Sequence, residues 1–170
     1  MYSSRNAVDV GSIAPGFKAR DVRGEAFDMA VFTGRSNLVI FFYRDSQCRT
    51  CREELKSIAG MYDYITQLGG EVVAVTTDSI DETKNLAVDL RLPYRMISDP
   101  EHRIIDTYGV FDSSTGKAHP VVFILGKNRI VRLRKHLEGL DDLLPAADIV
   151  NRLLDMTTGK STPFMSSRYK

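Results

Sequence analysis

The sequence predicts an α/β domain in which a central mixed sheet is covered by helices on both faces. Short apolar runs that suit buried strands alternate with segments whose apolar residues recur at helical spacing. The length of 170 residues suits one domain with one hydrophobic core, and no repeat or low-complexity segment divides the chain. We therefore expect one domain over residues 10–156, a flexible segment over residues 1–9 and a tail over residues 157–170.

The first half of the domain contains two strand patterns and two helix patterns. Residues 37–43 (NLVIFFY) form a continuous apolar run, which is typical of a strand buried on both faces. An apolar stripe at helical spacing follows the cysteines, and Gly69 marks its end. Residues 71–77 (EVVAVTT) predict a second strand, and the sequence SIDE from Ser79 fits the capping box of a helix that ends near residue 90.

The second half of the domain contains shorter patterns. Asp99 suits a helix N-cap because a proline follows it at the first helical position. Gly126 and Asn128 suit the turn of a β-hairpin. The elements expected here are, in order, a strand over residues 94–98, a helix over residues 100–109, hairpin strands over residues 121–125 and 130–133, and a helix over residues 142–156.

The charge balance argues against several classes of partner. The chain has 23 basic and 22 acidic side chains, so its formal net charge of +1 does not indicate a nucleic-acid or membrane-surface binder. The basic stretch over residues 129–136 alternates with apolar residues, as the solvated face of an edge strand does. No apolar run reaches the ~18 residues of a membrane span, and the first residues lack the apolar core of a secretory signal. We expect a cytoplasmic protein.

The two cysteines of the chain, Cys48 and Cys51, form a C-x-x-C motif between the first predicted strand and the following helix. Sites in open α/β sheets gather outside the carboxyl ends of strands. Unpaired N–H groups in the first turn of a helix favour a thiolate over a thiol. Three arginines add positive charge here: Arg44, Arg49 and Arg52. The sequence therefore predicts a redox-active cysteine pair.

Three other interpretations of the motif are weaker. A structural zinc site needs four ligands, and the remaining candidates, His102, His119 and His136, are not in paired spacing. A structural disulfide that closes such a short loop contributes little stability. Polar neighbours (QCRTCRE) argue against two merely buried hydrophobic side chains. We expect neither a metal nor a cofactor.

Several segments resemble those of one family, and they occur in the expected order. They are VGSIAPGFKARDVRGEAFDM, EVVAVTTDS, LPYRMISDPEHRIIDTYGVF and HPVVFILGKNRIVR. The chain resembles the thioredoxin-fold redoxins, and more closely their alkyl hydroperoxide reductase/thiol-specific antioxidant (peroxiredoxin) branch, over residues 10–154. The resemblance implies a thioredoxin-like fold.

The resemblance also implies candidate site residues, through the family pattern P-x-x-x-T-x-x-C-x-x-E. Cys51 stands at the cysteine of this pattern, and Glu54 at the glutamate. Tyr43 stands at the tyrosine before the proline; Arg44 replaces that proline and Cys48 replaces the threonine. In this alignment Cys51 attacks, and the other residues are supporting candidates. From local sequence alone, Glu54 is a solvated residue near a helix N-terminus and Tyr43 is a core residue.

A second alignment exchanges the roles of the cysteines. The position of the family's catalytic arginine is occupied by Pro120. Thioredoxin-like oxidoreductases carry a cis-proline there, facing the C-x-x-C, and in that alignment Cys48 attacks and Cys51 resolves. His119 then faces the cysteines and can shuttle a proton, or it is only a polar turn residue. The candidates to replace the arginine are Arg44 and Arg129.

The main functional expectation is a thiol-dependent antioxidant oxidoreductase that reduces hydroperoxides through a Cys48/Cys51 cycle. The resemblance implies a thioredoxin-like reductant, and it is compatible with a homodimer, although no residue pattern marks an interface. One alternative is a thiol–disulfide oxidoreductase that acts on protein disulfides. Another is a non-enzymatic redox sensor or metal-clip binding protein. The sequence leaves open which cysteine attacks first.

Overall fold

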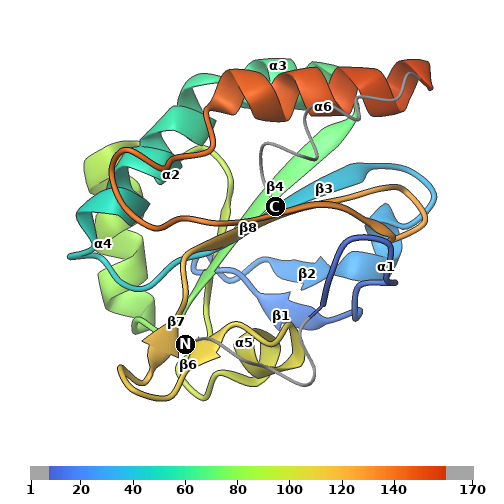
Figure 1. The fold of residues 1–170 in the computed structure, drawn as a ribbon. Helices are drawn as coiled ribbons and strands as arrows, with labels where there is room; N and C mark the ends of the chain where they lie inside the picture. Colours follow the sequence, from blue (N-terminus) through green and yellow to red (C-terminus); the bar gives the residue numbers. More distant parts are fainter. Residues whose placement is uncertain (1–7, 160–170) are drawn as a thin grey trace.

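A five-stranded mixed sheet forms the centre of the computed structural model, which describes residues 8–159 (Figure 1). Its strand order is β5-β4-β3-β8-β9. The first three of these pair in parallel, whereas β8 runs antiparallel to β3 and β9 antiparallel to β8. The strands are β3 (Asn37–Phe42), β4 (Gly70–Thr76), β5 (Arg95–Ser98), β8 (Val121–Leu125) and β9 (Val131–His136). The predicted mixed α/β sheet is confirmed.

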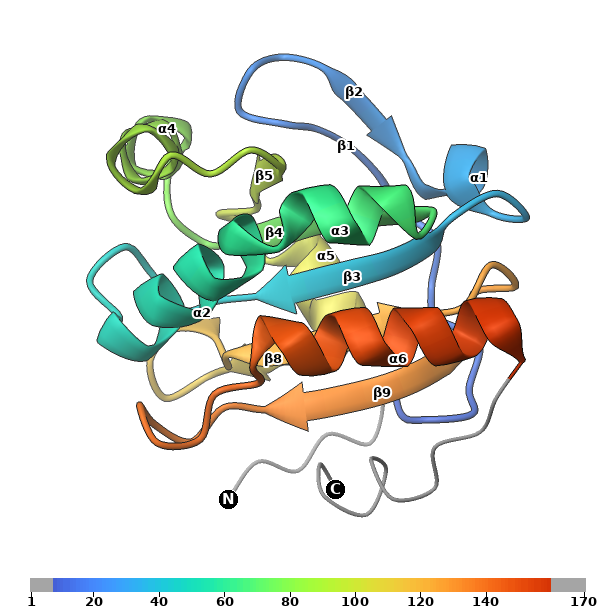
Figure 2. The ribbon, with the colours of Figure 1, turned by 90° about the horizontal axis from the view of Figure 1, so that it is seen from above.

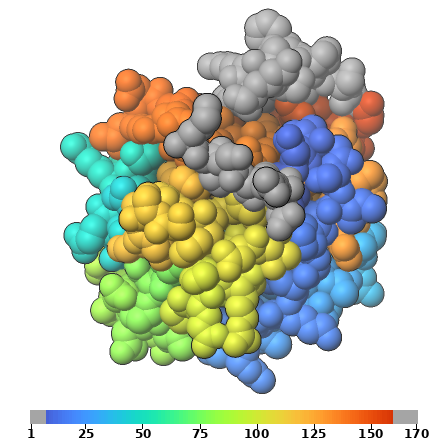
Figure 3. Space-filling model, turned by 60° about the horizontal axis from the view of Figure 1, so that its bottom comes forward, coloured from blue at the N-terminus to red at the C-terminus, as the bar shows by residue number. Residues whose placement is uncertain are grey.

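Helices cover both faces of this sheet, as predicted (Figure 2). Helices α2, α3 and α6 lie over one face, and α5 lies on the other. Small elements complete the second face, where α5 and the N-terminal part of the chain form a continuous surface (Figure 3). The helices are α1 (Met29–Phe32), α2 (Arg49–Gly60), α3 (Tyr62–Gln67), α4 (Ile80–Leu90), α5 (Arg103–Thr107) and α6 (Ala146–Thr158). The small strands are β1 (Lys18–Arg20), β2 (Ala26–Asp28), β6 (Phe111–Asp112) and β7 (Lys117–Ala118).

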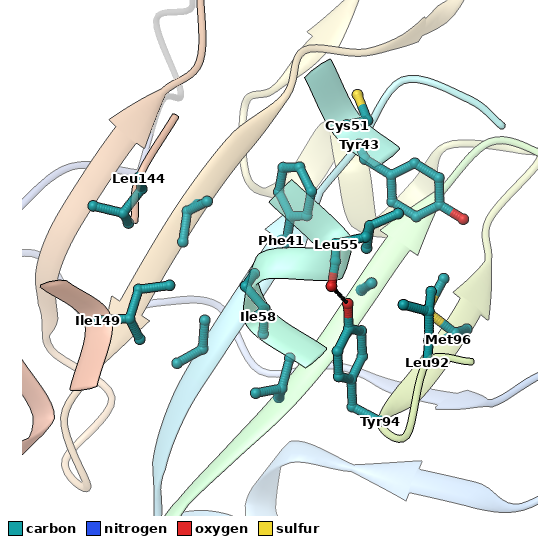
Figure 4. Close-up of a cluster of buried hydrophobic side chains, with 14 of the residues drawn as sticks. Phe41, Tyr43, Cys51, Leu55, Ile58, Leu92, Tyr94, Met96, Leu144 and Ile149 are labelled. Carbon is teal, nitrogen blue, oxygen red and sulfur yellow. Dashed lines mark hydrogen bonds between the residues drawn. The ribbon is translucent and has the colours of Figure 1, made fainter. Parts of the chain in front are cut away.

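Strand β3 contributes to a separate core on each face of the sheet. Val39 and Phe41 belong to the cluster beneath α2 and α6, together with Leu55 and Ile58 of α2 (Figure 4). The side chains between them on the strand, such as Ile40, belong to the cluster beneath α5. All six residues of β3 are buried, which is why the predicted run is apolar without alternation.

The edge of the sheet matches its prediction in part. Within the sheet, β9 has β8 as its neighbouring strand, and Val131 at its start also exchanges backbone hydrogen bonds with Gly11 and Ser12. Along β9, buried Val131 and Leu133 alternate with exposed Arg132. Arg132 therefore lies on the solvated side of an edge strand, whereas Arg134, Lys135 and His136 are half-buried. No helix within residues 8–159 has the length and the apolar character that crossing a membrane requires.

The helix predicted after the cysteines is divided at one residue. Met61 has φ −116°, which ends α2, and α3 begins at the next residue. The apolar stripe continues through both helices, so sequence periodicity alone does not reveal the break. The capping box at Ser79 is confirmed, since its hydroxyl accepts the Glu82 N–H and the Glu82 carboxylate accepts the Ser79 N–H, each at 3.1 Å.

Helix α5 begins three residues later than predicted, at Arg103, but its predicted capping residue still acts on it. The Asp99 carboxylate accepts the N–H groups of Arg103, Ile104 and Ile105 at 3.0–3.1 Å. Asp99 therefore lies outside the helix but provides the hydrogen-bond acceptors for the N–H groups of its first turn. Helix α6 begins at Ala146, four residues later than predicted, and extends to Thr158, two residues into the predicted tail. Residues 160–170, like residues 1–7, lie outside the described residues.

One buried hydrogen bond joins the start of β5 to α2 and gives a test of the fold. Tyr94, which is 3% exposed, donates from its hydroxyl to the carbonyl of Leu55 at 2.6 Å (Figure 4). We expect Tyr94→Phe to lower the free energy of unfolding in urea by about 1–2 kcal/mol, because a buried hydrogen bond is lost. The matched control is Tyr64→Phe on α3, where the ring is 57% exposed and the change should have little effect. Equal losses in both variants would contradict this account.

Candidate active site

The two cysteines lie where β3 ends and α2 begins. Cys48 is the N-cap residue of α2, and Cys51 lies in the first turn. Their sulfurs are joined in a disulfide, with the Cα atoms 5.2 Å apart, within the usual range for such bonds. Cys48 is 5% exposed and Cys51 is fully buried. The structure thus places the pair at the carboxyl end of a central strand, as the sequence predicts.

The two sulfurs differ in their position relative to the N-terminus of α2. The Cys51 N–H donates to the Cys48 Sγ at 3.2 Å, so this sulfur occupies the acceptor position of an N-cap side chain. An N-cap acceptor experiences the positive end of the helix dipole, which stabilises negative charge. When the disulfide is reduced, this position favours a Cys48 thiolate. Cys51 lies deeper, in the cluster of Phe41 and Tyr43 (Figure 4).

The loop before the cysteines is held by two buried carboxylates. Asp45 accepts the Gln47 N–H with its Oδ1 at 2.9 Å and the Cys48 N–H with its carbonyl at 3.3 Å. Asp78, just beyond the end of β4, accepts the Ser46 N–H at 2.8 Å. These bonds give each buried carboxylate a donor and fix the turn that leads into Cys48.

Asp45 and Asp78 differ in their proton affinity. Burial disfavours the charged form of Asp45, but the hydrogen bond and charge of Lys117 outweigh it and lower the pKa of Asp45. Lys117 Nζ lies 2.6 Å from Asp45 Oδ2, and Arg44 Nε lies 3.6 Å from the same oxygen. Burial raises the pKa of Asp78, and the carboxylates of Glu82 and Asp45 add to this effect. Arg44 is half exposed and therefore stands at the surface of the site.

Glu54 is buried, which corrects the local interpretation of it as a solvated residue. Its side chain is 0% exposed, and its Oε1 accepts the Leu144 N–H at 2.9 Å. Its Oε2 has no hydrogen-bond partner among the described residues. Burial raises the pKa of Glu54 to about 8, although the Leu144 N–H and the charge of Lys135 oppose the shift. Glu54 is therefore a neutral carboxyl at pH 7, one turn beyond Cys51.

Tyr43 is a core residue, as its position in the apolar run suggests. It is 0% exposed, and its N–H donates to the Val75 carbonyl at 3.0 Å, extending the pairing of β3 with β4. Burial raises the pKa of Tyr43, and the charge of Asp78 adds to this, whereas the hydroxyls of Thr76 and Thr83 oppose it. The phenol therefore stays protonated beside the cysteines.

Pro120 lies at the start of β8, and its predicted cis peptide bond is wrong: the bond between His119 and Pro120 is trans. The Pro120 carbonyl accepts the Leu137 N–H at 2.9 Å, because the chain is already extended where β8 begins to pair with β9. Arg129 lies beyond the far end of β8, where its Nε donates to the Ala14 carbonyl at 3.2 Å. It is therefore not available to replace the family's arginine.

The His119 ring lies among groups from the two hairpins. Its centroid is 5.4 Å from that of His136, with the rings perpendicular. Burial lowers the pKa of His119, and His136 and Arg134 add to this, whereas Asp112 opposes it. The imidazole is therefore neutral at pH 7. Its proposed proton shuttle stays a prediction.

Sequence reasoning did not identify Asp45, Asp78 or Lys117 as site residues. The sequence could have identified Asp78, because this residue follows the second parallel strand and therefore lies at the same edge of the sheet as the cysteines. No sequence pattern identifies Lys117, because it lies on a two-residue strand, 72 positions after Asp45. Its contribution depends on where the β6–β7 hairpin packs.

A disulfide-forming cysteine pair at the strand–helix junction of this sheet defines the class of thioredoxin-like redox proteins. Solved structures confirm the fold. Mycobacterium tuberculosis AhpC superposes with a TM-score of 0.77 at 15% identity, over 96% of this chain and 99% of that one. The peroxidoxin BcpB of Mycobacterium tuberculosis gives 0.75 at 16% identity, over 91% and 99%.

The family follows from the sequence match. The model of the AhpC/TSA family matches residues 10–134, and the chain belongs to that family. Peroxiredoxin Q, chloroplastic, of Oryza sativa subsp. japonica is 27% identical over 129 residues, which are 74% of this chain and 58% of the relative. Peroxiredoxin Bcp of Escherichia coli is 24% identical over 106 residues, 62% of this chain and 67% of the relative. The chain thus spans less than two thirds of the rice relative.

The buried Glu54 makes stability depend on pH in a definite direction. Its pKa rises from 4.5 to about 8 on folding, so its contribution is full below pH 4.5 and is lost as the pH rises through 8. We expect Glu54→Gln, a near-isosteric neutral substitution, to flatten the decline of unfolding free energy between pH 5 and pH 8. The difference should amount to about 1–4 kcal/mol across that range.

Urea unfolding of the oxidised protein at several pH values measures this effect. Glu53→Gln is the matched control, because Glu53 is exposed and its pKa is lowered by Lys56. This control should leave the decline between pH 5 and pH 8 unchanged. A decline in Glu54→Gln as steep as in the parent protein would show that Glu54 is ionised in the folded state.

Proposed function

We propose that this chain is a thiol peroxidase that reduces hydroperoxides with Cys48 as the attacking thiol and Cys51 as the resolving thiol. The observation that carries the proposal is the bond from the Cys51 N–H to the Cys48 Sγ at the N-terminus of α2. It favours a thiolate at the less deeply buried cysteine of a chain that belongs to the AhpC/TSA family. The names of its relatives, peroxiredoxin Q and peroxiredoxin Bcp, support the same reaction.

The proposed catalytic cycle has three steps. The Cys48 thiolate attacks one peroxide oxygen and breaks the O–O bond; the thiol is oxidised to a sulfenic acid, and the other oxygen leaves as an alcohol or water after protonation. The Cys51 thiol then attacks the sulfenic sulfur, which releases water and forms the disulfide seen here. An external dithiol reduces this disulfide by exchange and is itself oxidised.

The proposed supporting residues act around these two sulfurs. Arg44 lies at the surface of the loop and supplies a cation for the departing oxygen, where the family pattern has proline. Tyr43 packs beside Cys51, and Glu54 joins α2 to the segment at Leu144. Beside the loop lies a hollow of about 270 Å³, whose lining includes neither cysteine; it is lined by Ser46, Gln47, Arg52, Glu82, Asn85, Leu86 and Asp89.

A second candidate function is thiol–disulfide exchange with protein disulfides. Pro120 occupies the position of the family's arginine, and Arg129 is at the other end of the sheet. A thiolate at the N-cap of α2 can attack a disulfide sulfur as well as a peroxide oxygen. The same pair then forms a mixed disulfide with the substrate before Cys51 resolves it.

The proposed partners follow from the cycle. A dithiol protein of the thioredoxin type is the proposed reductant, and a compartment that maintains it in reduced form is required, for which we propose the cytoplasm. Cofactors are not needed for these steps, because both electrons come from thiols. We propose neither nucleic acid nor a membrane as a partner; assembly as a homodimer remains a prediction.

Single cysteine variants test the proposed roles. We expect reduced Cys51→Ser to react with one equivalent of hydrogen peroxide and to form a sulfenic acid at Cys48, trapped by dimedone and located by mass spectrometry. Cys48→Ser should react no faster than free cysteine, because its remaining thiol is buried and lacks the N-cap position. Stopped-flow measurement of thiol loss gives both rates, and far-UV circular dichroism confirms that each variant is folded. The opposite pattern would assign the attack to Cys51.

The parent protein distinguishes the two candidate functions. If hydrogen peroxide oxidises the reduced pair no faster than free cysteine, the peroxidase proposal is wrong. Catalysis of insulin disulfide reduction in the same preparation would then support the second candidate. Activity that survives replacement of both cysteines by serine would contradict both candidates.

A further inference from the structure

Lys117 reaches the redox site from a distant hairpin. It lies on β7, and its Nζ is 2.6 Å from the Oδ2 of Asp45, 72 positions earlier in the chain. The Asp45 side chain is only 11% exposed, whereas that of Lys117 is 40% exposed. Asp45 thus presents one oxygen to a lysine that approaches from the surface. An ion pair that is buried at one end is screened less than a surface pair.

The other oxygen of Asp45 determines the conformation of the turn before Cys48. Oδ1 accepts the Gln47 N–H, and the Asp45 carbonyl accepts the Cys48 N–H. The orientation of this carboxylate is therefore coupled to the backbone that delivers the N-cap cysteine. Because Lys117 binds Oδ2, it restricts rotation of the same carboxylate.

The charge of Lys117 matters as much as its position. Asp45 and Asp78 both lie beside the turn that leads into Cys48, and two carboxylates would oppose a thiolate there. Burial disfavours the charge of Asp45, yet its pKa is lowered, while the hydrogen bond to Asp45 raises the pKa of Lys117. Both shifts show an ionised pair. Other ionisable groups on the elements that meet here include Arg44, Asp78, Glu82 and Asp112, and on α2 Arg49, Arg52, Glu53 and Glu54.

We propose that Lys117 is a positioning residue of the redox site: through Asp45 it holds the turn from which Cys48 attacks, and it offsets the carboxylate charge beside that thiol. The inference rests on the proposed role of Cys48 as the attacking thiol. It assigns the β6–β7 hairpin a part in the reactivity of a cysteine on another element. Lys117 acts through Asp45 and does not touch the substrate.

The test measures the thiol of Cys48 directly. In the reduced Cys51→Ser background, the rate of alkylation by iodoacetamide as a function of pH gives the midpoint of Cys48 ionisation. We expect Lys117→Met to raise this midpoint by about half a pH unit or more, since a cation near the site is removed. Lys117→Arg should restore most of the shift. Lys127→Met, on an exposed residue of the β8–β9 turn, is the matched control and should leave the midpoint unchanged.

A second substitution shows whether the effect passes through Asp45. Asp45→Asn keeps an acceptor for the Gln47 N–H but removes the charge, so it should lower the midpoint even if Lys117→Met does not fold. In the Asp45→Asn background, Lys117→Met should shift the midpoint less than in the parent. An unchanged midpoint in folded Lys117→Met, or an equal shift in both backgrounds, would overturn the proposal. Because alkylation needs no peroxide, the result of this test can be interpreted even if the peroxidase proposal is wrong.

Discussion

The bond from the Cys51 N–H to the Cys48 Sγ is the interaction around which the rest of the site is arranged. It exists because β3, buried on both faces, ends at a fixed point, and because the five residues that follow then place a sulfur at the N-cap of α2. An N-cap must accept an orphan N–H and lie at the positive end of the helix. A cysteine at this position caps the helix and is also reactive, because the same N–H group and helix dipole that its sulfur caps also favour its thiolate.

The buried carboxyls around this bond show how neighbours decide protonation. Glu54 and Asp45 both lose water on folding, but they reach opposite states. Glu54 gains one backbone N–H and a distant lysine charge, which do not compensate its burial, and it stays neutral at pH 7. Asp45 gains Lys117 in direct contact and stays ionised. The cysteine pair therefore lies between a neutral carboxyl on the helix side and a compensated charge on the loop side.

Sequence patterns predicted what depends on neighbours along the chain. The apolar run of β3, the capping box at Ser79 and the strand–helix setting of the cysteines are local signals, and the structure confirms them. The predictions that were wrong concern residues whose surroundings come from distant segments of the chain. Glu54 is buried where Leu144, 90 positions later, packs against it, and Pro120, whose preceding peptide bond is trans, accepts the N–H of Leu137 from a later segment. No local pattern reports such contacts.

The departures from the family pattern have a chemical consequence. Breaking an O–O bond places negative charge on both oxygens, and donors aimed at that charge lower the barrier. This chain lacks the arginine at position 120, and the half-exposed Arg44 already lies 3.6 Å from Asp45. A cation shared with a carboxylate stabilises a leaving oxygen less than an unshared one. Disulfide exchange has less need of such a donor, because a sulfur leaving group spreads its charge over a larger atom. In the proposed cycle, reactivity therefore depends chiefly on how well the N-cap and the Asp45–Lys117 pair stabilise the Cys48 thiolate, and the same requirement holds for the proposed disulfide exchange.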